Sequence, residues 1–130
     1  RRINLQAVLP VPVTIVTGAD YAAREHAIAS AMAAMPAPPA SAHAVLLEGL
    51  PQGNPVLHPS AQIALQRIAP GCICCAGQLT LKVTLNRLLR PRPARLWLAM
   101  ASSAHYDSLC ELLKNAPYSE ILLADQHISL

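Results

Sequence analysis

Short aliphatic runs alternate along this chain with segments of helical pattern, and this alternation limits the possible folds more than any other feature. Residues 11–18, VPVTIVTG, are rich in β-branched side chains and end in glycine, which is typical of a buried strand. Similar apolar runs occur at 42–49, 94–101 and 119–125. Because buried strands that alternate with helices form parallel sheets, the sequence predicts an α/β fold, a three-layer sandwich with a mostly parallel sheet and helices on both faces.

Three segments have the composition or the spacing of helices. Residues 21–35 are rich in alanine and contain neither glycine nor proline, and Asp20 can cap their start. Residues 77–90 place leucines at helical spacing, and residues 105–116 are amphipathic. Residues 61–70 are ambiguous, and we expect a short helix there followed by a strand at its end.

Length, composition and charge exclude several classes of protein. The chain has 130 residues, of which 53% are hydrophobic, and this fits a single domain over residues 1–130 whose core needs no disulfides. The net charge of +3 is too small to indicate nucleic acid, and no aromatic residues lie among the arginines of residues 87–95. No apolar run approaches the roughly 18 residues of a membrane span, and the start does not resemble a signal peptide. We therefore expect a cytoplasmic protein without nucleic-acid or membrane partners.

Three of the four cysteines lie within the five residues GCICC at 71–75. In an extended segment Cys72 and Cys74 would point the same way, and a turn allowed by the flanking glycines would bring Cys75 to them. Thiolates bind Zn²⁺ or Cu⁺, so the segment predicts a transition-metal site, with zinc as the first candidate. Other groups must complete the coordination, and the candidates are Glu48, His58, His105, Cys110, water or a second molecule.

Two other interpretations of the cysteines remain open. Free cysteines often serve as small buried hydrophobic side chains, and neighbouring thiols can form a disulfide. Cys110 lies between Leu109 and Leu112, so we expect it in the core.

The GCICC segment resembles the GCxCC motif of the CobW-like family of P-loop GTPases, which are linked to metal insertion and metallochaperone work. The neighbouring features occur in the family's order: VTIVTG, AVLLEG, GCICC, a helix at 77–90 and RLWLAMASS. The resemblance spans roughly residues 11–125. It implies a P-loop NTPase-like fold, a cysteine loop at 71–77, and metal ligands at Cys72, Cys74 and Cys75, with help from Glu48 and His105.

The segment that corresponds to the family's phosphate-binding loop, residues 17–26, departs from the motif G-x-x-x-x-G-K-[ST]. Gly18 matches the first glycine, but Ala23 replaces the second glycine, Arg24 the lysine and Glu25 the hydroxyl residue, while Tyr21 adds bulk. Glycines let backbone N–H groups surround phosphates, and the hydroxyl holds Mg²⁺. We expect Glu25 to repel a metal-bound nucleotide, and only Gly18 and Arg24 to retain a weak capacity for phosphate.

The other catalytic motifs of the family are also lost. The Glu-x-x-Gly switch falls approximately on residues 99–102, AMAS, and the guanine-reading motif [NT]KxD is absent. The group Ser102, Ser103, His105 and Asp107 suggests a hydrolase triad, but it fits a loop and helix start better because triad members come from separated segments. We therefore expect no catalytic residues and no GTP hydrolysis.

Three hypotheses follow from the sequence. The first is a non-hydrolysing CobW-like domain that binds zinc through GCICC and serves in metal homeostasis, with a client metalloprotein or a second copy as partner. The second is a GTP-binding metallochaperone domain with a divergent phosphate loop, which would still bind nucleotide at Gly18 and the helix start. The third is a pseudo-GTPase interaction module whose cysteines are inert.

Overall fold

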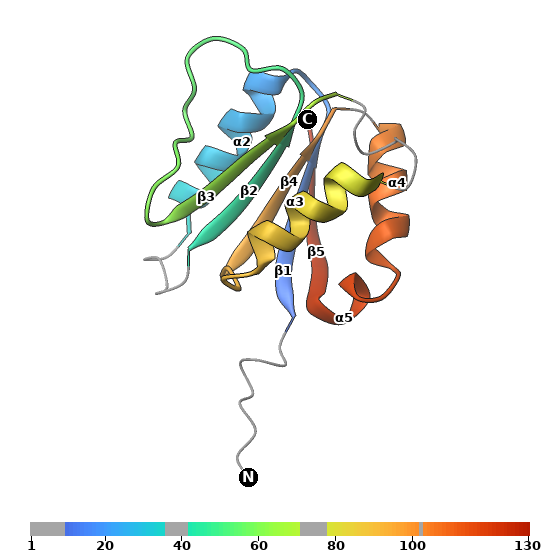
Figure 1. Cartoon of the computed structure of the whole chain (residues 1–130). Helices are drawn as coiled ribbons and strands as arrows, with labels where there is room; N and C mark the ends of the chain where they lie inside the picture. Colours follow the sequence, from blue (N-terminus) through green and yellow to red (C-terminus); the bar gives the residue numbers. More distant parts are fainter. Residues whose placement is uncertain (1–9, 36–41, 71–77, 102) are drawn as a thin grey trace.

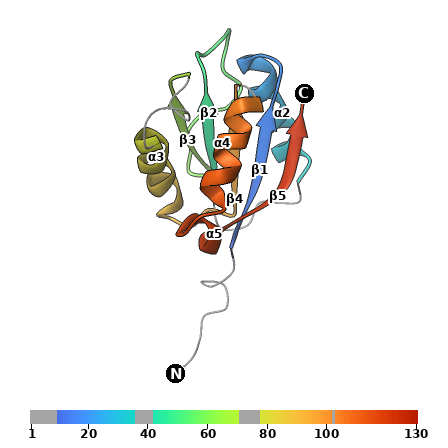
Figure 2. The ribbon, with the colours of Figure 1, turned by 90° about the vertical axis from the view of Figure 1, so that its right-hand side faces the viewer.

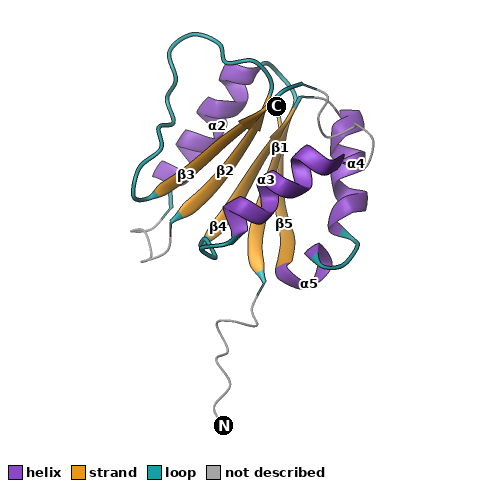
Figure 3. Ribbon diagram, in the orientation of Figure 1, coloured by secondary structure: helices purple, strands orange, loops and turns teal. Residues whose placement is uncertain are grey.

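The computed structural model describes residues 10–35, 42–70, 78–101 and 103–130. Five strands and four helices follow one another within these ranges (Figures 1 and 3). In chain order they are β1 (Val11–Thr17), α2 (Tyr21–Ala33), β2 (His43–Glu48), β3 (Ile63–Ile68), α3 (Leu79–Leu89), β4 (Arg95–Met100), α4 (Ser103–Leu113), α5 (Tyr118–Ile121) and β5 (Leu122–Ser129).

All five strands are parallel and form one sheet in the order β3-β2-β4-β1-β5. The chain therefore moves from β1 past the position of β4 to reach β2, and returns after β3 to fill the gap. Val13 of β1 lies opposite Leu96 of β4, and His43 of β2 lies opposite Ile63 of β3. The α/β fold predicted from the alternating pattern is confirmed, and the sheet is wholly parallel.

Helices cover both faces of the sheet because successive side chains of a strand point to opposite sides. Val16, Val45 and Trp97 belong to the core beneath α2. Val13, Leu46 and other side chains of the opposite face pack with α3, α4 and α5 in a second, larger core. Figure 2 shows α2 and α3 on opposite sides of the strands. The strands read as nearly continuous hydrophobic runs because both of their faces are buried.

Helix α2 starts where the sequence predicts. Asp20 has extended backbone angles, and its carboxylate accepts a hydrogen bond from the Ala23 N–H at 2.8 Å. Helix α3 begins after Gln78, whose φ is +52°, and buries Leu81, Leu85 and Leu88 as their spacing predicts.

Two segments differ from their predictions. Residues 63–68 form a strand without a preceding helix, because they pair with β2 in register along their whole length. Residues 119–121 are helical, not extended, and form α5 with Tyr118, whose side chain is buried. The final strand therefore starts at Leu122 and runs on to Ser129 beside β1.

Among the described residues, no helix has both the length and the apolarity that crossing a bilayer would require.

Candidate functional site

The carboxyl ends of β1, β2 and β4 meet at one edge of the sheet, and this edge is the candidate site. β1 and β4 are neighbours, yet β1 leads into α2 on one face and β4 leads into α4 on the other. Open parallel sheets bind ligands at such a point, where the connections leave in opposite directions and open a crevice. Gly18, Glu48 and His105, which the sequence singles out, lie at the ends of these strands or in the segments that follow them.

Glu48, the last residue of β2, is fully buried and links two neighbouring segments. Its Oε1 accepts a hydrogen bond from the Ala101 N–H at 2.7 Å and lies 2.8 Å from Nδ1 of His105. His105 comes from α4, so the contact joins the ends of β2 and β4 to the first turns of that helix. The structure thus brings together Glu48 and His105, two of the predicted metal ligands.

Arg24 is also buried, and its side chain turns back into the loop that follows β1. Its Nη1 donates hydrogen bonds to the carbonyl oxygens of Gly18, at 3.1 Å, and of Ala19, at 2.7 Å. Burial lowers the pKa of Arg24, and the nearby Glu48 carboxylate opposes this shift. The Nε of Arg24 is buried and has no partner among the described residues. The guanidinium therefore binds carbonyl oxygens of residues 18 and 19. In a phosphate-binding loop, the corresponding segment would bind an anion through its N–H groups.

Two backbone donors in the first turn of α2 already have side-chain acceptors. The Ala23 N–H donates to Asp20, and the Ala22 N–H donates to Oε1 of Gln52 at 3.1 Å. The helix begins at Tyr21, so only residues 18–20 separate it from β1. The sequence predicts the cap by Asp20, but Gln52 lies in a turn segment where no local pattern connects it to α2.

Gly18 is required here by the path of the chain. Its φ is +91°, and a Cβ at this position would lie 2.5 Å from the carbonyl oxygen of Leu130. The Leu130 N–H in turn donates to the Thr17 carbonyl at 2.8 Å. The close passage of these two backbones explains the glycine without reference to a phosphate.

Glu25 does not lie where its position in the motif predicts. Its carboxylate is buried, and Oε2 accepts hydrogen bonds from the N–H groups of Val56 and Leu57. Tyr21 is buried too, and its hydroxyl accepts a hydrogen bond from Nε of Arg67 at 2.6 Å. Both side chains thus contact segments that flank the site. The Glu25 carboxylate is hydrogen-bonded to the segment between β2 and β3, and this is not the position from which the sequence predicts repulsion of a nucleotide.

Cys72, Cys74 and Cys75 lie outside the described residues. The segment that carries them leaves β3 beside the end of β2, because the Gly49 N–H donates to the Ile68 carbonyl at 3.0 Å. Cys110 is only partly buried on α4, so the prediction that it belongs to the core is wrong, and His58 is exposed between β2 and β3. Within the described ranges, no three His, Cys, Asp or Glu side chains are grouped closely enough to hold a metal.

A scan against protein-family models and searches among curated proteins and solved structures found no match for this chain, so its function must be argued from the sequence and from the residues at this edge.

Proposed function

We propose that this chain is a transition-metal-binding domain, with zinc as the first candidate, and that it resembles the CobW-like proteins in fold and metal site but does not hydrolyse GTP. The thiolates of Cys72, Cys74 and Cys75 are the ligands that the sequence supplies. The observation that carries the proposal is the contact of the buried Glu48 carboxylate with His105. This contact lies at the edge of the sheet where β3 ends, and the segment with the cysteines follows β3 in the chain.

The contact between Glu48 and His105 has the form of a metal ligand and its supporting group. Histidine ligands commonly donate one ring N–H to a carboxylate, which fixes the ring and the tautomer and raises the basicity of the other nitrogen. Here Nδ1 faces Glu48, so Nε2 is the nitrogen that would bind metal. Glu48 is then a positioning residue, because its Oε1 already contacts both His105 and the Ala101 N–H.

Three thiolates and one imidazole form a Cys₃His donor set, which suits the tetrahedral coordination that zinc takes in closed sites. Residues 69–78 connect the end of β3 to the start of α3, and the end of β3 is hydrogen-bonded next to Glu48. The proposal places His105 as the fourth ligand, ahead of His58, which is exposed on the connection between β2 and β3.

The absence of GTP hydrolysis is supported by the hydrogen bonds around α2. A phosphate loop needs free N–H groups and a cation that reaches the phosphates. In this chain Asp20 and Gln52 accept from the first turns of α2, and Arg24 donates to Gly18 and Ala19. An incoming phosphate would have to displace all of these contacts.

Zinc titration of the reduced chain in competition with a chromophoric chelator tests the metal site. We expect one zinc per chain, and we expect the triple variant Cys72→Ser, Cys74→Ser, Cys75→Ser to lose it. The variant Cys110→Ser is the matched control, because this thiol lies on α4, and it should bind zinc like the wild type. A wild-type chain that leaves all zinc with the chelator would refute the proposal.

The role of His105 is tested separately from that of the thiols. Glu48→Gln should weaken zinc binding by about 10–100-fold, the usual effect of losing a ligand's supporting group, and His105→Gln, which removes the ligand itself, should weaken it at least as much. His26→Gln, at an exposed position on α2, should leave the affinity unchanged. Wild-type affinity in the His105 and Glu48 variants would remove these two residues from the site while leaving the cysteines in it.

A further inference from the structure

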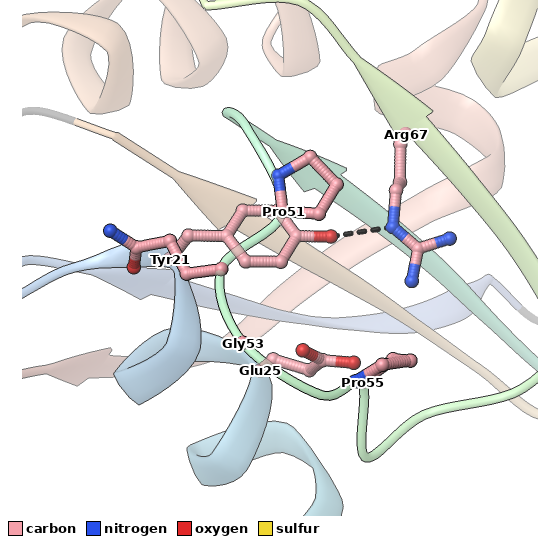
Figure 4. Close-up of a pocket in the computed structure, with 7 residues that line it drawn as sticks. Tyr21, Glu25, Pro51, Gly53, Pro55 and Arg67 are labelled. Carbon is pink, nitrogen blue, oxygen red and sulfur yellow. Dashed lines mark hydrogen bonds between the residues drawn. The ribbon is translucent and has the colours of Figure 1, made fainter.

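A cavity lies beside the start of α2, on the face of the sheet that this helix covers. It has a volume of about 260 Å³, is open to solvent on one side, and is lined by α2, by the segment that follows β2, and by edge strand β3. Its lining includes Tyr21, Glu25, Pro51, Gly53, Pro55 and Arg67 (Figure 4). Pockets for drug-sized ligands measure roughly 300–1,000 Å³, so this cavity suits a smaller molecule.

The walls of the cavity are apolar, but two opposite charges face it. Tyr21, Pro51 and Pro55 supply its apolar lining, and Glu25 and Arg67 supply the charges (Figure 4). In the described part of the chain, Arg67 and Glu25 form no ion pair with each other, although both line the same cavity. The cavity thus has a cation and an anion that are not neutralised by direct contact.

Arg67 is an exposed residue of edge strand β3, and one of its nitrogens forms a hydrogen bond within the described residues. Its Nε donates to the Tyr21 hydroxyl at 2.6 Å, while its two terminal nitrogens have no hydrogen-bond partner among the described residues. These nitrogens can bind a carboxylate with two parallel hydrogen bonds, the geometry that guanidinium groups favour.

Glu25 offers the complementary group. Only about 2% of this residue is exposed, and its Oε2 accepts from the N–H groups of Val56 and Leu57. Its Oε1 has no partner in the described part of the chain, although an ionised carboxylate has about four acceptor sites. A buried carboxylate with unused acceptor sites favours a cationic donor.

We propose that this cavity binds a free α-amino acid with an apolar side chain. The ligand's carboxylate would meet the terminal nitrogens of Arg67, its ammonium group would meet Oε1 of Glu25, and its side chain would lie against Tyr21 and the prolines. A zwitterion satisfies both charges at once, whereas a ligand with a single charge leaves one of them unpaired. This inference is independent of the metal proposal, because the two sites share no residue.

Isothermal titration of the intact chain with L-leucine, L-valine and L-proline tests the proposal, and two analogues of leucine test the role of each charge. Leucinamide lacks the carboxylate, and 4-methylpentanoate lacks the ammonium group. We expect at least one of the three amino acids to bind saturably. Leucinamide and 4-methylpentanoate should each bind more weakly than leucine, by about tenfold or more. No saturable binding by any of the three, or equal binding of leucine and leucinamide, would overturn it.

Variants locate the binding in this cavity. Arg67→Met keeps an unbranched side chain but removes the guanidinium, and should weaken leucine binding about tenfold, since it removes the charge that pairs with the carboxylate. Arg87→Met, at an exposed position on α3, is the control and should bind like the wild type. Wild-type affinity in Arg67→Met would refute the assignment. Glu25→Gln should also weaken binding, and if that variant fails to fold, the analogue series and Arg67→Met still decide the question.

Discussion

Arg24 and Glu25 are neighbours on α2, yet each buried charge is compensated by backbone groups of a different segment. Arg24 donates to the carbonyls of Gly18 and Ala19, while Glu25 accepts from the N–H groups of Val56 and Leu57. Buried ionised groups need such partners, because burial without them costs several kcal/mol. At the scale of single residues, the first turns of α2 thus hold the two loops beside it.

Gly18→Ala should destabilise the protein. The residue would have to keep a φ of +91°, and its Cβ would lie 2.5 Å from the Leu130 carbonyl oxygen. A strained backbone alone costs about 1–3 kcal/mol, and the clash adds to this cost. Gly53→Ala is a matched control, because Gly53 also has a positive φ but no atom lies within 4 Å of its Cβ position. Urea unfolding should show the larger loss for Gly18→Ala, and equal losses would contradict the assigned contact with Leu130.

His43 should make stability depend on pH. Burial, helped by the charge of Arg95, lowers the pKa of His43 below its ordinary value of 6.5, and its Nδ1 accepts a hydrogen bond from Trp97 Nε1 at 3.1 Å. The unfolded chain therefore binds a proton at a higher pH than the folded chain does. The contribution of this group to stability is fully present above pH 6.5 and is lost progressively as the pH falls below it.

The variant His43→Asn keeps an acceptor for Trp97 but does not titrate. Between about pH 7 and pH 5, we expect the free energy of unfolding to fall less in this variant than in the wild type. The slopes of the two proteins against pH should differ by less than about 1.4 kcal/mol per pH unit, the limit for one titrating group. His26→Asn, at an exposed position on α2, should keep the wild-type slope. An unchanged slope in His43→Asn would show that the imidazole does not carry the effect.

Among the elements, β5 is the strand whose side chains are most exposed, and a set of polar contacts connects it to the rest of the sheet. Arg95 of β4 forms a bidentate ion pair with Asp125, and Thr14 of β1 donates to Gln126. His127 lies 2.8 Å from the Thr17 hydroxyl. These contacts supplement the backbone ladder with β1 at the edge of the sheet, where burial of apolar side chains contributes little.

Asp125→Ala should therefore loosen β5 with little effect on the whole fold. Hydrogen exchange of the β5 amides should become faster, while the global free energy of unfolding should fall by less than about 1 kcal/mol, because the ion pair is partly exposed. The control is Glu111→Ala, which removes an exposed contact at 3.5 Å between α4 and Lys114, the residue after this helix. Exchange rates in β5 that match those of the wild type would contradict a role for the ion pair in holding this strand.

The segment from β1 to α2 should fail to bind nucleotide. Because Ala22 and Ala23 donate to other groups, titration with GTP and Mg²⁺ should give no saturable heat up to millimolar concentration, about the limit of weak specific binding. Saturable micromolar binding would contradict the proposed loss of the phosphate site and favour the GTP-binding hypothesis instead.

For the whole molecule, zinc and leucine should stabilise the fold independently. Each ligand raises the free energy of unfolding by mass action, by about 2.7 kcal/mol at one hundred times its dissociation constant. Since the two proposed sites share no residue, the effects of both ligands together should equal their sum within about 0.5 kcal/mol in thermal or urea unfolding. A larger deviation would show that the sites are coupled through the segment between β2 and β3.

Much of the whole fold could be predicted from the sequence, because buried parallel strands and amphipathic helices have distinct patterns. The strands near Val13 and Trp97 and the helix capped by Asp20 lie where these patterns place them. Strand β3 was harder to predict, since its strand character comes from pairing with β2 and not from its own residues. The helical turn at Tyr118 likewise depends on burial of that ring.

The candidate site was predictable only in part. Glu48 and His105 follow strands whose ends meet in a parallel sheet, so their proximity could be anticipated from the topology. The roles of Gln52 and Arg67 could not, because each acts on α2 from a segment far away in the sequence. The geometry of Glu25 was missed for the same reason, since its partners Val56 and Leu57 are about 30 residues away.

The way Arg24 binds its own loop limits what a single substitution could do there. The carbonyls of Gly18 and Ala19 point toward the guanidinium, so the loop presents oxygen atoms to its interior. The substitution Arg24→Lys would place an ammonium group among the same oxygens and would create no receptor for an anion. An anion-binding loop at this place would require the peptide groups themselves to turn over, which a substitution of a single side chain does not achieve.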